Sequence, residues 1–352
     1  MSSTWVERSG LMGAAEALGR RMPRTCRAQQ ARRAQQARRG RQAARSPQVG
    51  QNPLMGRWRG AAVDGRAGGR VLGDVDVARA IDICALDPVA SILATARIET
   101  AARVGLRAAG GQLWGFEADG VLTAVCWAGA NLVPVVPDGD PAALDAFAAM
   151  GRAQGRRSSS IVGEAAMVLG LWERLSEHWP RAREVRADQP SLVISGDPAV
   201  APDPRVRRTT AADYDAVLPA CVRMFVEEVG YSPVSGSGTG PYETRVRTLI
   251  AEGWSFARFE DGHGSRRPGG VVFKAELGAV AGGVAQVQGV WVNPARRGEG
   301  LSKSGMAAVV QAARRDIAPV VSLYANHYNE RALAAYRAVG FEQVGTYATV
   351  LF

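Results

Sequence analysis

The chain has 352 residues, of which 47% are hydrophobic and 22% charged, so it can bury at least one sizeable core and is not wholly disordered. Its formal net charge of +10 at pH 7 would suggest an anionic partner if the charge were evenly spread. Residues 1–70, however, hold 15 Arg, no Lys and three acids, whereas the remaining residues have slightly more acids than bases. The basic character therefore belongs to the N-terminal segment.

Residues 1–69 lack hydrophobic periodicity and contain the hexamer AQQARR twice, at 28–33 and 34–39. We expect a disordered Arg-rich tail, because no core can form there. Arginine clusters can bind RNA or lipid headgroups. An upstream start codon in a GC-rich bacterial gene produces the same composition, and Met55 is a later start. We favour the second interpretation and expect no nucleic-acid partner.

Nothing in the sequence indicates export, a membrane or a metal. The first 30 residues contain no apolar run of signal-peptide length, and no 18 apolar residues are consecutive. The four cysteines and three histidines are too scattered for a metal site or a disulfide framework. We therefore expect a cytoplasmic protein with reduced thiols and no membrane partner.

Residues 70–195 predict a first unit of ten elements. Asp119-Gly120 is typical of a tight turn between two paired strands. In chain order, hydrophobic patterns and breakers predict a strand near 71–72, helices 74–86 and 88–103, strands 113–116, 121–127 and 132–136, helix 141–153, strand 160–162, helix 163–179 and strand 192–194.

A proline-rich linker, residues 196–204, separates this unit from a second one at 205–352. The second unit predicts strand 206–208, helices 210–229 and 242–252, strands 254–259, 271–279 and 285–292, helix 301–317, strand 319–325, helix 329–339 and strand 346–352. Both units have the order β-α-α-β-β-β-α-β-α-β, without obvious sequence similarity. The expected fold is α/β (α+β), with two tandem domains that each have a mixed central sheet flanked by helices.

The most informative segment, residues 292–302, lies between a predicted strand and a predicted helix. Gly298 and Gly300 allow close approach of the backbone to a ligand, and the helix start offers free N–H groups. Arg296 and Arg297 add positive charge. The segment therefore predicts an anion site, although its glycines match neither a Walker A loop nor a dinucleotide-binding fingerprint.

A second motif follows one helix and one strand later. Residues 329–341 contain Asn-x-x-Ala-x-x-x-Tyr-x-x-x-Gly-Phe, and residues 297–302 match Arg/Gln-x-x-Gly-x-Gly/Ala except for Ser302 at the last position. Together these motifs resemble the GNAT superfamily of acyl-CoA-dependent N-acetyltransferases over residues 205–352. The whole chain resembles bacterial tandem GNAT proteins, in which residues 70–195 would form a degenerate GNAT-like domain.

The resemblance implies acetyl-CoA as co-substrate and assigns a set of residues to it. The implied CoA-binding residues are Val290, Val292, Arg296, Arg297, Gly298, Glu299, Gly300, Leu301, Ser302 and Asn329. A backbone N–H near Val290 would polarise the thioester carbonyl. Tyr336 would protonate the leaving thiolate, whereas Glu299 places a negative charge close to the pyrophosphate.

The general base departs from the family pattern. Many members have a glutamate near the start of the fourth strand, but Gln286 and Gln288 occupy that region here. Glu276 on the preceding strand is the nearest carboxylate and is our candidate base. Glu227 and Glu228 are more distant candidates, and water is a further one.

The first unit lacks an equivalent of the predicted anion-binding segment at 292–302, which we call the phosphate loop. Residues 137–141, Pro-Asp-Gly-Asp-Pro, replace it, and their two aspartates would repel pyrophosphate. We therefore expect this unit to shape the substrate cleft without binding CoA. The sequence predicts direct acetyl transfer to an amine, a small molecule or a protein amine, in residues 205–352. A CoA-binding pseudoenzyme and an RNA-associated protein remain alternatives.

Overall fold

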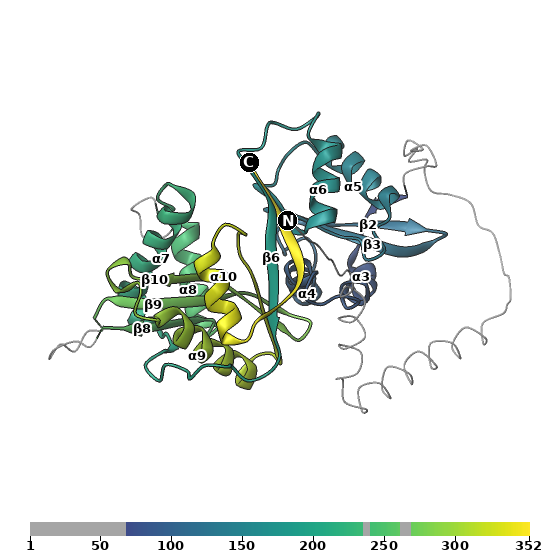
Figure 1. Ribbon diagram of the computed structural model, residues 1–352. Helices are drawn as coiled ribbons and strands as arrows, with labels where there is room; N and C mark the ends of the chain where they lie inside the picture. Colours follow the sequence, from purple (N-terminus) through teal and green to yellow (C-terminus); the bar gives the residue numbers. More distant parts are fainter. Residues whose placement is uncertain (1–67, 235–239, 261–268) are drawn as a thin grey trace, which may run out of the picture. The chain divides into compact units, whose positions relative to one another are not determined.

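The computed structural model describes residues 68–234, 240–260 and 269–352 (Figure 1). The predicted tail lies outside the described residues except for its last two positions, as does part of the loop before residue 240. In the described ranges, no helix is both long and apolar enough to span a bilayer. The same ranges contain no group of three or more His, Cys, Asp or Glu arranged to hold a metal ion.

The first half contains the ten elements in the expected order, with Asp119 and Gly120 at positive φ in the predicted turn. The elements are β1 (Gly69–Val71), α3 (Val77–Cys84), α4 (Ile92–Val104), β2 (Gln112–Ala118), β3 (Val121–Ala128), β4 (Asn131–Val135), α5 (Pro141–Gln154), β5 (Ser160–Glu164), α6 (Ala165–Leu175) and β6 (Glu184–Ile194). A short 3₁₀ turn, η1 (Asp74–Asp76), precedes α3.

The second half repeats this order. Its elements are β7 (Arg207–Arg208), α7 (Tyr214–Val229), α8 (Pro241–Ala251), β8 (Ser255–Phe259), β9 (Val271–Ala281), β10 (Val284–Val292), α9 (Leu301–Asp316), β11 (Val320–Tyr324), α10 (Glu330–Val339) and β12 (Glu342–Leu351). The 3₁₀ turns η2 (Ala211–Asp213) and η3 (Pro294–Arg296) precede α7 and α9. The predicted α/β order is confirmed in both halves.

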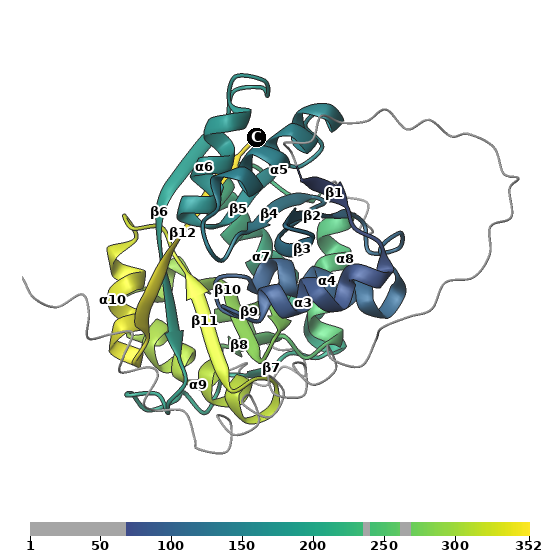
Figure 2. The same cartoon turned by 90° about the vertical axis from the view of Figure 1, so that its right-hand side faces the viewer.

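The twelve strands of the described residues form one mixed sheet in the order β1-β2-β3-β4-β5-β12-β6-β11-β10-β9-β8-β7 (Figure 2). The last strands of the two halves are exchanged at its centre. β12 of the second half pairs with β5 of the first, and β6 of the first half pairs with β11 of the second. The linker at 196–204 marks where the repeat begins again along the chain, but the two sheets do not separate there.

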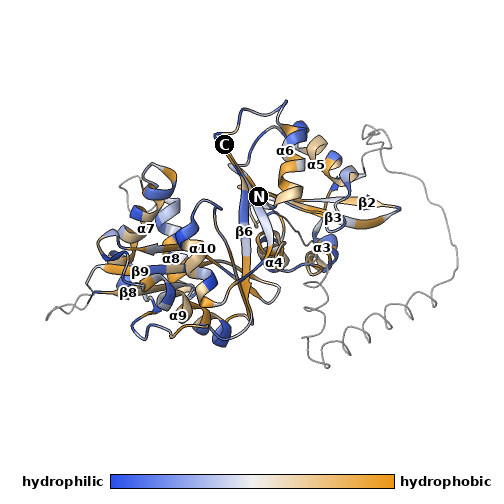
Figure 3. Ribbon diagram, viewed as in Figure 1, coloured by the Kyte–Doolittle hydropathy of each residue, from blue (hydrophilic) through white to orange (hydrophobic). Residues whose placement is uncertain are grey.

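The exchange extends into the hydrophobic cores, and ribbon segments coloured as hydrophobic run through both halves in Figure 3. Ala348 and Val350 of β12 are buried in a cluster that otherwise consists of first-half residues and the C-terminal Phe352. Leu192 and Ile194 of β6 are buried in the main cluster of the second half, which also contains α9 and α10 residues. Each half therefore completes the core of the other.

The two halves begin with the same ion-paired turn. Arg70 on β1 contacts Asp76 with two hydrogen bonds of 2.8 Å, and Arg207 on β7 contacts Asp213 in the same way. Each aspartate also accepts the backbone N–H three residues before it, at the start of its 3₁₀ turn. This shared Arg-x₅-Asp spacing is a sequence trace of the repeat that hydrophobic patterns did not reveal.

These buried aspartates make stability dependent on pH. The guanidinium of Arg207 lowers the pKa of Asp213 from 3.8 to about 2. Because the folded-state pKa is depressed, the stabilisation is complete above pH 4 and is lost as the pH falls toward 2. We expect Asp213→Asn to lower the free energy of unfolding by about 1–3 kcal/mol at pH 7 and by much less at pH 2, where the pH has reached the folded-state pKa of Asp213.

Urea unfolding between pH 2 and pH 7 measures this difference. Asp215→Asn is the matched control, because Asp215 is exposed and forms no hydrogen bond in the described ranges. A loss that is the same at pH 2 and pH 7 would contradict the role of the Arg207–Asp213 pair.

Candidate active site

A fork opens in the sheet of the second half between β10 and β11. The two parallel strands pair only from Val284 to Gln286 with Val320 to Ser322, so the rest of β10 leaves its neighbour. Ser322 lies at the apex of the fork, and its buried hydroxyl has no hydrogen-bond partner among the described residues. Beyond this point the backbone of β10, including Val290, has no β11 partner, whereas the Val292 carbonyl accepts a 3.2 Å hydrogen bond from the Arg297 side chain.

β10 carries an irregularity beside this fork. Its register against β9 shifts between Gln288 and Trp291, where Gly289 has a φ of 59°. Lys274 on β9 donates to the Gly289 carbonyl over 3.0 Å. The bulge places Val290 and Val292 against the same core as Tyr336, whereas Trp291 packs on the α7 side.

Glu276, the predicted base, is buried and ion-paired with Lys274. Its carboxylate accepts a 2.6 Å hydrogen bond from the Lys274 ammonium, which is itself 1% exposed. A carboxylate whose charge is held by a buried cation is a poor proton acceptor, and the geometry argues against Glu276 as the base. The expectation rested on its nearness in sequence and did not include Lys274.

The phosphate loop has the expected open backbone. Gly298 and Gly300 have φ values of 93° and 76°, which favour glycine, and Gly300 is the N-cap of α9. No side chain caps this helix start. Leu301 and Ser302 form the first turn of α9, so their N–H groups belong to the helix terminus that an anion would approach.

Both arginines of the loop already have carboxylate partners. Arg296 contacts Glu299 with bonds of 2.6 and 2.8 Å, and Arg297 contacts Glu227 on α7 at 2.6 Å. The Arg296 side chain lowers the pKa of Glu299, so this pair is charged at neutral pH. An incoming pyrophosphate would have to compete with these carboxylates.

Removing one competing carboxylate should strengthen anion binding. We expect Glu299→Gln to lower the dissociation constant for CoA by about two- to fivefold, because the mutation removes the shortest carboxylate contact of Arg296 and deletes a negative charge beside the loop. Calorimetric titration at low and high salt measures it, with the exposed Glu252→Gln as control. Weaker binding by Glu299→Gln would show that the carboxylate instead organises the loop.

Tyr336 is buried on α10, in the main hydrophobic core of the second half. Its ring packs edge-on against Phe341, and the hydroxyl makes no hydrogen bond within the part of the chain that the structure describes. Burial raises the pKa of Tyr336, and the charge of Glu228 raises it further. The phenol is therefore protonated at neutral pH and able to donate.

Asn329 caps the helix that carries Tyr336. Its side-chain oxygen accepts from the Ala332 N–H at 3.3 Å, and the residue is exposed. The Asn of the motif thus positions α10. Its predicted contact with the pantetheine arm stays a prediction.

Two further side chains lie within the influence of Glu228, whose charge also acts on Tyr336, and were not selected as site residues. Burial raises the pKa of Tyr324 on β11 to about 12, and Glu228 contributes. Arg186 on β6 donates two hydrogen bonds to Glu184, and its pKa is raised mainly by this contact and further by Tyr328 and Glu228. Because β6 belongs to the first half, that half contributes a charged residue to this region.

The corresponding site of the first half is blocked. β4 and β5 also diverge after two paired positions, Asn131 with Ser160 and Leu132 with Ile161. The helix that follows, α5, is capped by Asp140, whose carboxylate accepts from Ala142 at 2.8 Å. A carboxylate therefore occupies the helix start that remains open in α9.

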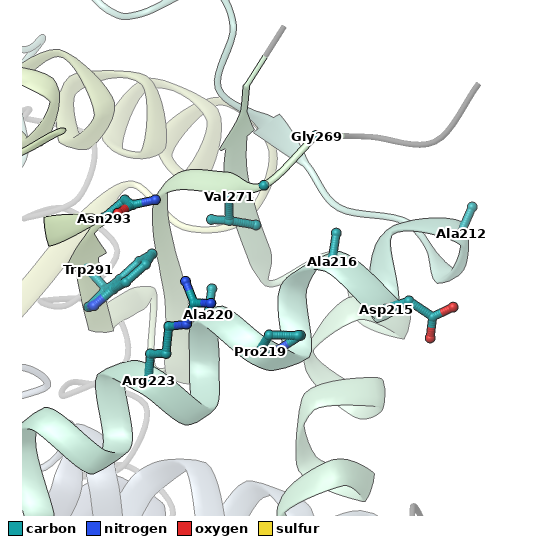
Figure 4. Close-up of a pocket in the computed structure, with 11 residues that line it drawn as sticks. Ala212, Asp215, Ala216, Pro219, Ala220, Arg223, Gly269, Val271, Trp291 and Asn293 are labelled. Atoms are coloured by element: carbon teal, nitrogen blue, oxygen red, sulfur yellow. The ribbon is translucent and has the colours of Figure 1, made fainter. Parts of the chain in front are cut away.

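A pocket of about 400 Å³ lies between α7 and the ends of β9 and β10 (Figure 4). Arg223 of α7 lies near Trp291, and Asn293 lies at the end of β10. The Asn293 side chain also accepts from Ala295 in η3, so the pocket adjoins the phosphate loop. None of the residues predicted as site residues lines it.

Comparison with known families agrees with this geometry. Residues 253–341 match the Acetyltransferase (GNAT) family. The second half therefore contains a domain of the GNAT acetyltransferase family. Residues 111–217 match the family called Domain of unknown function (DUF4081), which spans β2 to the start of α7. A search of curated proteins returned no match.

Among solved structures, a Drosophila protein is 13% identical with a TM-score of 0.56, covering 81% of this chain and 99% of its own. A GCN5-related N-acetyltransferase from Sphaerobacter thermophilus is 16% identical with a TM-score of 0.48, covering 82% of this chain and 96% of its own. A tandem GNAT protein from the clavulanic acid biosynthesis pathway is 12% identical with a TM-score of 0.48, covering 80% and 98%. At 13% identity, the similarity to the Drosophila protein shows a shared fold and nothing about its activity.

Proposed function

We propose that this GNAT protein transfers an acetyl group from acetyl-CoA to an amine, and that the second half carries out the reaction. The proposal is carried by two features that occur together. β10 diverges from β11, and the loop after β10 leads to a helix, α9, whose start at Gly300 has no side-chain cap. An extended pantetheine arm fits a strand edge, and a pyrophosphate fits a helix start.

In the proposed reaction, the nitrogen lone pair of the amine attacks the thioester carbonyl and the C–S bond breaks. The amide and the free thiol of CoA are the products. The N–H of Val290 would stabilise the developing oxyanion, and Tyr336 would give its proton to the departing sulfur. Because Glu276 is paired with Lys274, we assign the removal of the amine proton to water.

The role of the first half follows from Asp140 and from the exchanged strands. Asp140 occupies the start of α5, so this half would bind no CoA. It would instead supply β6 and Arg186 beside the fork. We therefore propose that residues 70–195 are a degenerate GNAT-like domain that completes the catalytic domain at 205–352.

Calorimetry with acetyl-CoA and an acceptor screen that follows thiol release test the proposal. We expect one equivalent of CoA per chain and turnover with at least one class of amine. Two equivalents would refute the assignment of the first half. Binding without turnover by any amine would favour a CoA-binding protein that is not an enzyme.

A further inference from the structure

Lys274 is an unusual residue in this chain. Only two of the 43 basic residues are lysines, and this one is 1% exposed on a central strand. Burying an ammonium is costly unless it is paired and hydrogen-bonded. The ammonium lies 3.4 Å from the sulfur of Met224 on α7. The burial of this charge therefore needs an explanation.

The ammonium of Lys274 joins two groups. It donates to the Glu276 carboxylate at 2.6 Å and to the Gly289 carbonyl at 3.0 Å. Although burial alone would lower the pKa of Lys274, the charge of Glu276 and the contact with Cys221 raise it. Lys274 is therefore a cation at neutral pH, and one of its protons points at the bulge of β10.

The bulge is shaped around this pair. A Cβ at Gly289 would lie 2.6 Å from the Glu276 carboxylate, and the φ of 59° disfavours other residues. Glycine is thus required where the strand passes the ion pair. The role that the structure gives to Glu276 is to neutralise Lys274 at this point.

The carbonyl of Gly289 and the N–H of Val290 belong to one planar peptide unit. In a trans peptide they point in opposite directions, so the N–H points away from Lys274. Val290 packs against the cluster that contains Tyr336. Positive charge on the carbonyl oxygen withdraws electrons from the unit and makes the N–H a stronger donor.

We propose that Lys274 is a positioning residue that holds and polarises the peptide unit between Gly289 and Val290, so that the Val290 N–H binds the thioester oxygen more strongly as negative charge develops. The catalytic part of this inference rests on the proposed function. The polarisation itself does not, since it is a property of the protein without ligand.

The first experiment needs no ligand. The chain contains four Gly–Val peptide bonds, at 120–121, 270–271, 283–284 and 289–290, so labelling Gly carbonyl carbon and Val nitrogen selects four amides. We expect Lys274→Met to move the Val290 amide upfield while the other three stay in place. Glu276→Gln breaks the same ion pair but keeps Lys274, which still donates to the Gly289 carbonyl. This variant should therefore move the Val290 amide signal less.

A purely structural ion pair predicts equal shifts in the two variants, and that result would overturn the proposal. So would an unmoved Val290 amide in Lys274→Met. If Lys274→Met does not fold, the double variant Lys274→Met/Glu276→Met removes both charges and should show the upfield shift.

The second experiment uses acetyl-CoA and an acceptor found in the screen. We expect Lys274→Met to lower kcat about 10-fold with an unchanged KM for acetyl-CoA, because the lost polarisation acts in the transition state. An unchanged kcat despite a shifted amide would overturn the catalytic part. Absence of acetyl-CoA binding by the unmodified protein would instead refute the proposed function, and the amide shifts would still decide the polarisation.

Discussion

Replacing Tyr336 with Phe should lower kcat for acetyl transfer about 10- to 100-fold while the affinity for CoA stays within threefold. The hydroxyl has no hydrogen-bond partner among the described residues, so its removal costs the folded protein little. The ring contact with Phe341 is retained. What disappears is the proton donor that we propose for the thiolate, and general acids contribute on this scale or above it. Steady-state rates and CoA titration measure the two quantities.

The matched control is Tyr214→Phe. Tyr214 also has a buried hydroxyl with no partner in the described ranges, but it lies at the start of α7. It should keep full activity and the same melting temperature as Tyr336→Phe. Because the pKa of Tyr336 is raised, the rate of the unmodified enzyme should not fall by loss of its proton as the pH rises toward 10. Equal rates for Tyr336→Phe and the unmodified protein would remove Tyr336 from the mechanism.

The order of the elements was predictable because each carries a local pattern. Helices such as α9 show apolar residues at helical spacing. The dipeptide Asp119-Gly120 alone predicts the turn between β2 and β3. The outer part of β6, from Glu184, was missed because its side chains are mostly exposed and polar. Sheet pairing gave it an extended form that no apolar alternation indicated.

The exchange of β6 and β12 could not be predicted from local patterns. The two strands occupy equivalent positions in the repeat, and either could pair with β5 or with β11. Their choice depends on packing in the assembled cores, where Leu192 and Val350 are buried. Hydrophobic periodicity identifies a strand but not its partner.

For the candidate site, motif spacing selected the glycine loop and Tyr336, but it did not identify which charges are paired. Arg297 meets Glu227, which is 70 residues away in sequence. Lys274 belongs to no motif. The scarcity of lysine in an arginine-rich chain was the one sequence feature that could have drawn attention to it.

The largest expected effect concerns the exchanged strands. We expect residues 197–352, expressed alone, to show no cooperative unfolding transition and no CoA binding. This fragment lacks β6, so Leu192 and Ile194 no longer fill its core. Burying each such side chain contributes about 1.5–3 kcal/mol, and the total stability of a domain is about 5–15 kcal/mol. β11 would also lose its pairing with β6, and β12 its pairing with both β5 and β6.

The complementary fragment, residues 68–196, is the matched partner for this test. It lacks β12, so Ala348 and Val350 are missing from its core. Mixing or co-expressing the two fragments should restore a 1:1 complex that unfolds in one transition and binds CoA, because the cut between Gly196 and Asp197 lies in an exposed segment. Circular dichroism and size-exclusion chromatography follow the recovery. Cooperative folding of residues 197–352 alone would mean that β11 and β12 can pair directly. The second half would then not need β6 in order to fold.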